Sequence, residues 1–139
     1  MSTEKVVIVD VDGTVALRNG RKPFDWTKIE QDKPNLSVIE LVNRIASTGV
    51  KIIFVSGREQ KYHNETVKWL EKFHNHPILL YCRRDQDFRK DELVKFEIFR
   101  DEILGKYEVI AVFEDRNRMV EMWRELLGLT CLQVAPGNF

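Results

Sequence analysis

Five short apolar runs divide the chain and predict buried β-strands. Most of them are apolar at consecutive positions, which is typical of a parallel sheet covered on both faces. They lie at residues 6–11, 51–55, 78–81, 109–113 and 131–134. Between them, apolar residues recur at three- and four-residue steps and predict helices. These stretches lie at residues 36–46, 67–73, 93–103 and 119–126.

The alternation of strands and helices predicts one α/β domain. The simplest such fold is a three-layer α/β/α sandwich, Rossmann-like, with a central parallel sheet and right-handed crossovers. In sheets of this kind, ligands bind beyond the carboxyl ends of the strands. One long irregular connection, residues 13–34, has room for a small hairpin. We therefore expect an essentially capless domain with its site at the strand ends.

Composition limits the classes of protein to which the chain can belong. Its 139 residues, 43 % of them apolar or aromatic, suffice for one core and one domain, residues 1–139. The 22 Lys and Arg residues balance 22 Asp and Glu residues, which excludes a polyanion-wrapping basic protein and a charged disordered tail. The first residues lack the pattern of a secretory signal, and no run approaches the ~18 apolar residues of a membrane span. We therefore expect a cytoplasmic protein with no membrane partner.

Cysteine and histidine give no sign of a disulfide framework or a zinc site. Cys82 and Cys131 stand in separate apolar runs, so we expect both to be buried thiols in a reducing compartment. The histidines His63, His74 and His76 belong to no motif, and we expect them on the surface.

Acidic pairs follow the first and the fourth predicted strand. Asp10 and Asp12 stand two positions apart, so they would share one face of a regular strand. Glu114 and Asp115 follow the fourth strand, at the same edge of the sheet. Like charges this close repel unless a cation relieves them, and Mg²⁺ prefers oxygen ligands. The alternative is a solvated turn, because Asp is a common turn residue.

Other polar residues are expected at the same edge. Ser56, Gly57 and Arg58 follow the second strand, where a hydroxyl and a guanidinium group can hold phosphate oxygens. The alternative is an ordinary strand-to-loop turn. Asp91 and Lys95 stand four apart on a predicted helix, and the alternative there is a surface ion pair worth ~0.5 kcal/mol.

The order of these motifs resembles the haloacid dehalogenase (HAD) superfamily of phosphohydrolases. It runs from Asp10-Val11-Asp12-Gly13-Thr14 through Ser56 and Lys95 to Glu114-Asp115. The arginine-containing segments are similar to the 3′-phosphatase domains of phage polynucleotide kinase-phosphatases. They are Asn19-Gly20-Arg21, Val55-Ser56-Gly57-Arg58, Arg89-Lys90-Asp91, Glu114-Asp115-Arg116 and Val120-Glu121-Met122-Trp123-Arg124. No Gly-rich loop ending in Gly-Lys-Ser/Thr accompanies them, so we expect no kinase domain.

The resemblance implies a Mg²⁺-dependent phosphomonoesterase that removes the 3′-phosphate from DNA or RNA ends. In that mechanism Asp10 attacks phosphorus to form an aspartyl-phosphate. Asp12 protonates the leaving oxygen and later activates water. Ser56 and Lys95 bind phosphoryl oxygens, and Asp91 orients Lys95.

The resemblance also implies how metal and substrate are held. The expected metal ligands are Asp10, the backbone carbonyl of Asp12, and Asp115. Glu114 stands where this family has Asp, and we expect it to reach the metal through water. The remaining expected substrate contacts are Thr14, Arg21, Gly57, Arg58 and Asp91, with both arginines at the mouth of the site.

Basic residues gather in the segments that should rim this site and favour a sequence-independent nucleic-acid substrate. They are Arg18, Arg21, Lys22, Arg83, Arg84, Arg89 and Lys90. The alternative is an ordinary solvated surface. Trp26, together with Phe24, has a further claim to touch substrate. The resemblance makes a separate kinase or ligase a candidate partner, in the host cytoplasm if the gene belongs to a phage.

Two other functions stay open. A capless HAD phosphatase of small phosphomonoesters, such as nucleotides or sugar phosphates, would carry the same motifs. A receiver domain of a signalling protein is also a small α/β unit, but its acceptor aspartate follows the third strand. Here that strand continues into Tyr81, Cys82 and Arg83.

Overall fold

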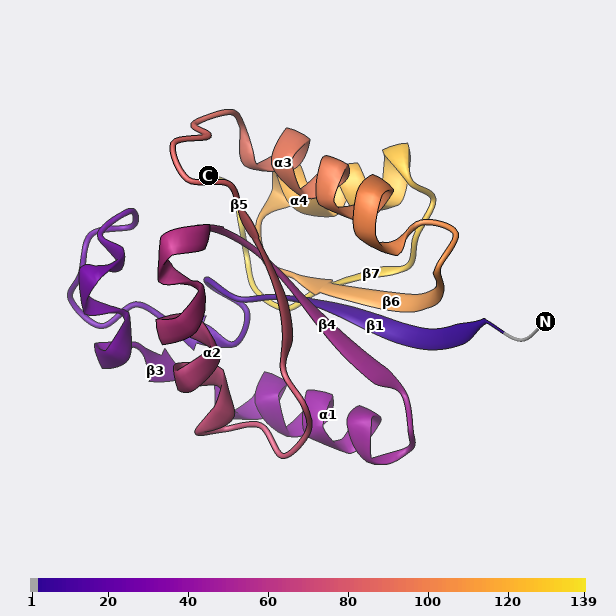
Figure 1. Cartoon of the computed structure of the whole chain (residues 1–139), viewed down its shortest axis with the longest axis horizontal. Helices are drawn as coiled ribbons and strands as arrows, with labels where there is room; N and C mark the ends of the chain where they lie inside the picture. Colours follow the sequence, from indigo (N-terminus) through magenta and orange to yellow (C-terminus); the bar gives the residue numbers. More distant parts are fainter. Residues whose placement is uncertain (1–2) are drawn as a thin grey trace.

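A five-stranded parallel sheet forms the centre of the molecule (Figure 1). The structure is a computed structural model and describes residues 3–139. The strands follow the order β5-β4-β1-β6-β7, with β1 in the middle. Their bounds are β1 Glu4–Asp10, β4 Lys51–Glu59, β5 Leu79–Arg83, β6 Tyr107–Glu114 and β7 Cys131–Gln133. All five predicted strands are present, and they pair in parallel.

Helices cover both faces of the sheet (Figure 1). α1 and α2 pack on one face, and α3 and α4 on the other. Their bounds are α1 Leu36–Ser47, α2 His63–Glu71, α3 Asp91–Ile98 and α4 Asn117–Glu121. The last two continue as wider π-helical turns, over Phe99–Ile103 and Met122–Leu126, so the helical stretches predicted there are present. The predicted three-layer α/β/α sandwich is confirmed.

Alternate residues of β1 contribute to two separate cores. Val7 and Val9 pack with α1 and α2, whereas Val6 and Ile8 pack with the α3 and α4 side. This explains why the strand is apolar at consecutive positions, since both of its faces are buried. The same alternation directs Asp10, the last residue of β1, towards the α3 side.

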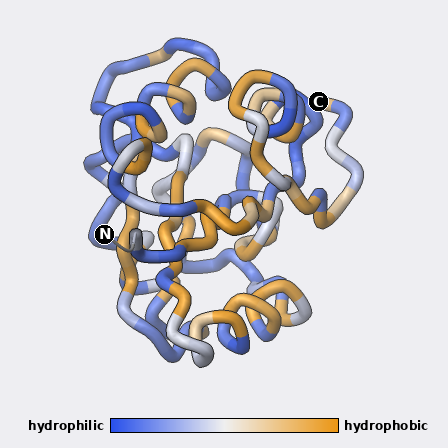
Figure 2. The backbone as a smooth tube through the Cα atoms, turned by 90° about the vertical axis from the view of Figure 1, so that its right-hand side faces the viewer, coloured by the Kyte–Doolittle hydropathy of each residue, from blue (hydrophilic) through white to orange (hydrophobic). Residues whose placement is uncertain are grey.

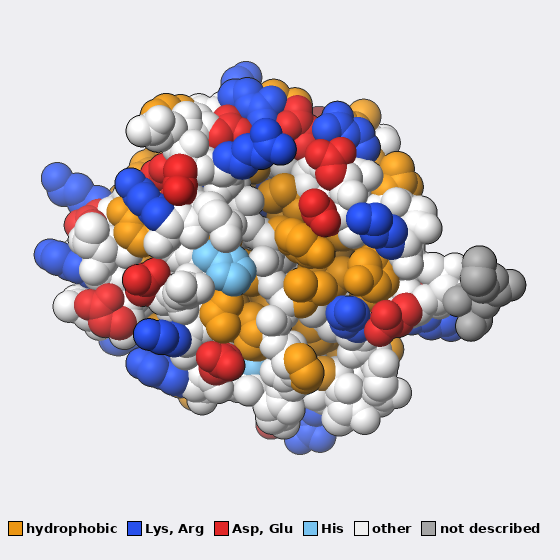
Figure 3. All heavy atoms as spheres, in the orientation of Figure 1, with side chains coloured by type: hydrophobic (Ala, Val, Ile, Leu, Met, Phe, Trp, Pro, Cys, Tyr) orange, Lys and Arg blue, Asp and Glu red, His pale blue; other side chains and the backbone are white. Residues whose placement is uncertain are grey.

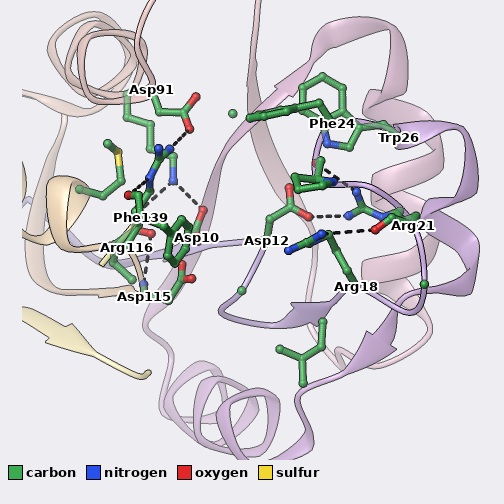
Figure 4. Close-up of a pocket in the computed structure, with 18 residues that line it drawn as sticks. Asp10, Asp12, Arg18, Arg21, Phe24, Trp26, Asp91, Asp115, Arg116 and Phe139 are labelled. Atoms are coloured by element: carbon green, nitrogen blue, oxygen red, sulfur yellow. Dashed lines mark hydrogen bonds and ion pairs between the residues drawn. The ribbon is translucent and has the colours of Figure 1, made fainter. Parts of the chain in front are cut away.

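The expected small hairpin fills the connection between β1 and α1. β2, Ala16–Leu17, pairs antiparallel with β3, Lys33–Pro34. A 3₁₀ helix, η1, spans Trp26–Gln31 between them, and the carboxylate of Asp25 accepts the amide of Thr27 at its start. The hairpin lies beside the carboxyl end of β1, where it forms one wall of the site (Figures 1 and 4).

The tube coloured by hydropathy shows hydrophobic segments through the centre and hydrophilic segments in the outer loops (Figure 2). Cys131 is buried as predicted, whereas Cys82 is only half-buried. Among residues 3–139, no helix combines the length and the apolar character that crossing a bilayer requires.

The prediction of three surface histidines is wrong for His74. It is 7 % exposed and follows the C-terminal end of α2, where its Nδ1 lies 2.8 Å from the main-chain oxygen of Leu70. Its ring packs edge-on against Phe54. Burial lowers the pKa of His74 to about 4. The other two histidines, His63 and His76, are half-buried.

Candidate active site

A cavity of about 840 Å³ opens at the carboxyl end of the sheet (Figure 4). It is lined by the ends of β1 and β6, by α3 and by the hairpin. The predicted site residues in its lining are Asp10, Asp12, Arg21, Gly57, Asp91, Lys95, Glu114 and Asp115. Residues from distant parts of the sequence are thus brought to one place, as the motif order predicts.

Three carboxylates, those of Asp10, Glu114 and Asp115, form an acidic cluster in this cavity. Asp10 ends β1, while Glu114 ends the neighbouring strand β6 and Asp115 follows it. One ligand oxygen from each residue lies within 4.8 Å of the others, and all three residues are buried. The acids predicted at two strand ends converge because these strands are adjacent and parallel.

Lys95, on α3, places an ammonium group between two of these carboxylates. Its Nζ donates to Asp10 Oδ1 at 2.6 Å and to Glu114 Oε2 at 3.1 Å. Thr14 Oγ1 donates to the other oxygen of Asp10, Oδ2, at 3.0 Å. Both oxygens of Asp10 are therefore held by donors, which fixes the orientation of the carboxylate.

The electrostatics of the acidic cluster follow from three buried acids around one ammonium group. Burial raises the pKa of Asp10, but the charge of Lys95 and hydrogen bonds with Glu114, Lys95 and Asp115 together outweigh burial, and the net pKa lies below its ordinary value. Burial and the charge of Asp10 raise the pKa of Glu114 well above its ordinary value and that of Asp115 to about 7. Ionisation of Glu114 and Asp115 is therefore unfavourable in this cluster, and a further positive charge nearby would make it favourable.

The donor set fits a small, hard cation. Mg²⁺ prefers carboxylate oxygens and keeps several waters, so few protein ligands suffice. The oxygens of Glu114 already accept hydrogen bonds from Lys95, from the indole of Trp123 at 3.3 Å and from the amide of Asp115 at 3.2 Å. Glu114 thus accepts three hydrogen bonds, whereas Asp10 accepts two and Asp115 one, from Thr14 at 3.3 Å. Asp10 and Asp115 therefore have more free lone pairs to offer as direct ligands. That Glu114 acts through water stays a prediction, and these contacts favour it.

Gly13 lets Asp115 approach the end of β1. Its φ of +83° is the left-handed conformation that glycine adopts without steric cost. A Cβ atom at this position would overlap the carboxylate of Asp115. The backbone conformation and the packing therefore both require glycine here.

Asp12 points away from the acidic cluster, towards the hairpin (Figure 4). This corrects the expectation that it shares a face with Asp10. β1 ends at Asp10, and the chain then turns so that the main-chain oxygen of Val11 accepts the amides of residues 14–16. The alternation of a regular strand does not extend beyond that turn. That the backbone carbonyl of Asp12 binds metal stays a prediction.

Two arginines hold the Asp12 carboxylate. Arg58 donates from Nε to Oδ2 at 3.0 Å and from Nη2 to Oδ1 at 2.7 Å. Arg21 donates from Nη2 to Oδ1 at 2.9 Å. Both guanidinium side chains are 1 % exposed, so they do not stand at the mouth of the site as expected. A buried guanidinium group needs acceptors inside the protein, and Asp12 is one of them. The two arginines therefore hold Asp12 in place.

Asp32 binds both arginines, and its role was not predicted from the sequence. We call Asp12, Arg21, Asp32 and Arg58 the arginine cluster. Asp32 Oδ1 accepts Arg21 Nε at 2.8 Å, and its Oδ2 accepts Arg58 Nη2 at 3.0 Å. When both carboxylates are ionised, the two guanidinium groups leave the cluster without net charge. An acid in an irregular connection is typical of a solvated turn, so only the folded hairpin reveals this role.

Ser56 and Gly57 lie inside the long strand β4, which continues beyond the predicted end at residue 55, and not in the alternative strand-to-loop turn. Ser56 is fully buried, and its hydroxyl oxygen accepts the amide of Arg58 at 3.0 Å. Gly57 lines the cavity, and a Cβ atom there would lie 3.0 Å from Asp91 Oδ1. The roles of Ser56 and Gly57 in binding phosphate stay predictions.

Asp91 has partners other than the expected one. Its carboxylate pairs with Arg83, and its Oδ2 accepts Arg116 Nη1 at 2.7 Å. No hydrogen bond or ion pair joins it to Lys95 among the contacts of the described chain, so the role of Asp91 in orienting Lys95 stays a prediction. Arg83 also donates to the main-chain oxygen of Gly57 at 2.6 Å, which joins the ends of β4 and β5 to the start of α3.

The basic rim is smaller than predicted. Arg83, like Arg21, is buried and binds acceptors inside the protein. Arg89 pairs with both Asp87 and Glu97. Figure 3 shows Lys and Arg interspersed with Asp and Glu on the face it presents, rather than a continuous basic surface.

Known proteins resemble this chain over nearly all of its length. The family model of the polynucleotide kinase PNKP phosphatase domain matches residues 4–139. The chain belongs to this family. The resemblance to HAD phosphohydrolases is thereby confirmed, and the chain is a PNKP-type phosphatase domain.

Two solved structures and a viral protein are similar to this PNKP-type domain. A chain in the structure of the Pnkp1/Rnl/Hen1 complex is 42 % identical with a TM-score of 0.94, over 99 % of this chain and 48 % of that one. A chain in the Pnkp1/Rnl/Hen1 RNA repair complex is 43 % identical with a TM-score of 0.92, over 99 % and 44 %. The putative bifunctional polynucleotide kinase/RNA ligase of Autographa californica nuclear polyhedrosis virus is 39 % identical over 125 residues, 88 % of this chain and 18 % of its own length. The PNKP-type domain therefore spans less than half of each of these relatives.

A more distant structure shares the fold alone. The class C acid phosphatase from Bacillus anthracis superposes with a TM-score of 0.67 at 17 % identity, over 99 % of this chain and 68 % of that one.

Proposed function

We propose that this domain removes the 3′-phosphate from polynucleotide ends with the help of Mg²⁺. One observation carries the proposal: a single cavity joins the acidic cluster and Lys95 to the separately held Asp12. The acidic cluster offers a nucleophile and metal ligands, and Asp12 offers a site for proton transfer. The family supports a phosphatase, and the names of its relatives, a polynucleotide kinase/RNA ligase and an RNA repair complex, support a nucleic-acid end as substrate.

In the first step, an oxygen of Asp10 attacks the phosphorus atom. A bond forms between Asp10 Oδ and phosphorus, and the bond between phosphorus and the 3′ oxygen breaks. Protonated Asp12 gives its proton to that oxygen, which leaves as the 3′-hydroxyl. Lys95 offsets the charge of the phosphoryl oxygens. The product on the protein is an aspartyl-phosphate.

In the second step, water attacks the phosphorus of the aspartyl-phosphate. Asp12 takes a proton from this water, the bond between phosphorus and Asp10 Oδ breaks, and inorganic phosphate leaves. The arginine cluster holds Asp12 in one position for both steps. Splitting the hydrolysis in this way replaces one slow step by two easier ones.

Asp10 and Asp115 are the residues that would hold Mg²⁺. A bound Mg²⁺ neutralises charge on the phosphoryl oxygens. Glu114 keeps Lys95 in place through the contact at 3.1 Å. Gly13 leaves the space that the Asp115 carboxylate occupies.

The proposal is tested by phosphate release from three substrates, each with Mg²⁺ and with EDTA. They are an oligonucleotide with a 3′-phosphate, the same oligonucleotide with a 5′-phosphate, and a sugar phosphate. We expect release from the 3′-phosphate alone, and only with Mg²⁺. A higher kcat/KM on the sugar phosphate would instead support a phosphatase of small molecules.

Two variants assign that activity to the cavity. Asp10→Asn should abolish phosphate release. Asp101→Asn, at an exposed residue paired with Arg100, is the matched control and should keep wild-type activity. We further expect a kinase and a ligase to act beside this domain, because its relatives are named for those activities.

A further inference from the structure

We propose that Phe24 and Trp26 form a stacking site for the terminal nucleobase of the substrate. This inference rests on the proposed function. It assigns a place to the part of the substrate that the acidic cluster does not contact.

The two aromatic residues line the same cavity as Asp10 (Figure 4). In that view Asp12 lies between the acidic cluster on one side and Phe24 and Trp26 on the other. Asp12 is the proposed proton donor to the 3′ oxygen, which joins the phosphate to the nucleoside. With the phosphate on the side of Asp10, the sugar and base extend towards the aromatic pair.

The cavity has room for more than a phosphoryl group. Its volume of about 840 Å³ lies in the range of sites that hold whole small ligands, roughly 300–1,000 Å³. The acidic cluster occupies only one end. The aromatic end supplies the apolar surface that a nucleobase requires.

Phe24 is 75 % exposed, although exposing a large apolar ring to water is unfavourable. It does not belong to either hydrophobic core. An exposed ring beside a charged site offers its face to a second ring, and stacking of this kind tolerates any base because every base has a π-face. The site therefore suits a substrate recognised at its end rather than by its sequence.

The segment that carries Phe24 is tied to Asp12 by a single side chain. Arg21 Nη1 donates to the main-chain oxygens of Pro23 at 3.3 Å and Asp25 at 3.5 Å, on either side of Phe24. The Nη2 atom of the same guanidinium group binds Asp12 at 2.9 Å. Arg21 therefore fixes the position of Phe24 relative to Asp12 before substrate binds.

Trp26 packs against the ring of Phe24. The two rings meet edge to face, with centroids 6.2 Å apart and planes at 82°. Trp26 in turn contacts Tyr62 with centroids 5.7 Å apart. Such pairs favour a fixed geometry, so the row of rings limits the movement of Phe24.

The test compares two oligonucleotides that differ only at the terminal 3′-phosphorylated residue, one with a base and one abasic. Each is assayed with wild type, Phe24→Ala, Phe24→Tyr and Phe88→Ala. Phe88 is the matched control, since it is 81 % exposed but lies outside the cavity lining. Phe24→Ala should raise KM for the base-bearing end about tenfold, with little change in kcat. KM for the abasic end should not change.

The remaining outcomes separate this inference from the proposed function. Phe24→Tyr should behave as wild type because it keeps a stacking ring, and Phe88→Ala should also behave as wild type. Equal effects of Phe24→Ala on both oligonucleotides would overturn the stacking site and leave the 3′-phosphatase intact. If the wild type releases phosphate from neither oligonucleotide, the stacking site and the 3′-phosphatase function are both overturned.

Discussion

Arg58 binds Asp12 side-on, with its Nε 3.0 Å from Oδ2 and its Nη2 2.7 Å from Oδ1. A planar guanidinium fork makes this contact, and a point charge cannot reproduce it. The contact keeps the carboxylate of Asp12 in the cavity but apart from the acidic cluster. The proposed nucleophile and the proposed proton donor are therefore positioned by separate sets of residues.

Arg58→Lys keeps the charge but removes the fork, so Asp12 should lose its fixed orientation. We expect kcat for 3′-phosphate removal to fall about 100-fold, the effect of a displacement of roughly 1 Å in a catalytic group. The measurement is steady-state kinetics on a folded variant, checked by circular dichroism. Arg44→Lys, at an exposed residue of α1, is the control and should leave kcat unchanged. A wild-type kcat in Arg58→Lys would contradict the positioning role.

Asp32→Asn should destabilise the domain. It leaves the two buried guanidinium groups of the arginine cluster with a single carboxylate, and breaking a buried ion pair typically costs about 3 kcal/mol. Urea denaturation of the variant and wild type measures the loss in the free energy of unfolding. Asp101→Asn, at an exposed residue, should change it by less than about 0.5 kcal/mol. An equally small effect of Asp32→Asn would mean that Asp32 is not part of a tightly coupled cluster.

Gly13→Ala should abolish most of the activity because its Cβ atom would displace the Asp115 carboxylate. Gly20→Ala is an informative control, since Gly20 has the same φ of +83° but a Cβ atom there would meet no other part of the described chain within 4 Å. Both variants should lose about 1 kcal/mol of stability from the left-handed backbone. Only Gly13→Ala should also need much more Mg²⁺ for activity. Similar activity in the two variants would exclude the steric role of Gly13.

The stability of the domain should fall in mild acid because of His74. Its pKa in the fold, about 4, lies below its ordinary value of 6.5. The fold therefore favours the neutral ring, and above about pH 6.5 the ring is neutral in both the folded and the unfolded chain. As the pH falls from 6.5 towards 4, the unfolded chain binds a proton that the fold does not, so the free energy of unfolding falls by up to about 3 kcal/mol. His74→Leu should flatten this part of a plot of unfolding free energy against pH, and an unchanged slope would show that His74 is not the titrating group.

The fold could be predicted because its signal is local. Consecutive apolar residues in β1 require burial on both faces, and alternation of strands with helices leaves few arrangements. The convergence of Asp10 with Glu114 and Asp115 follows from the rule that parallel strands present their carboxyl ends at one edge.

The arginine cluster could not be predicted because it depends on how the irregular connection folds. The orientation of Asp12 changes with a turn that begins one residue after β1. Asp32 meets Arg58 across 26 positions of sequence, and only the hairpin brings them together. A lone acid or arginine in such a segment is indistinguishable from a solvated one. For the same reason the sequence suggested that both arginines contact substrate directly.

The central claim is that Asp10 captures the phosphoryl group in a cavity whose acidic cluster holds Mg²⁺. Its most direct test is mass spectrometry of acid-quenched protein after brief reaction with a 3′-phosphorylated oligonucleotide. Wild-type protein is quenched at a series of short times, because Asp12 acts in both steps and its replacement would also slow formation of the aspartyl-phosphate. We expect one phosphoryl group on the peptide that contains Asp10, with Mg²⁺ but not with EDTA. A phosphoryl group on another residue, or phosphate release with no covalent species at any quench time, would contradict the claim.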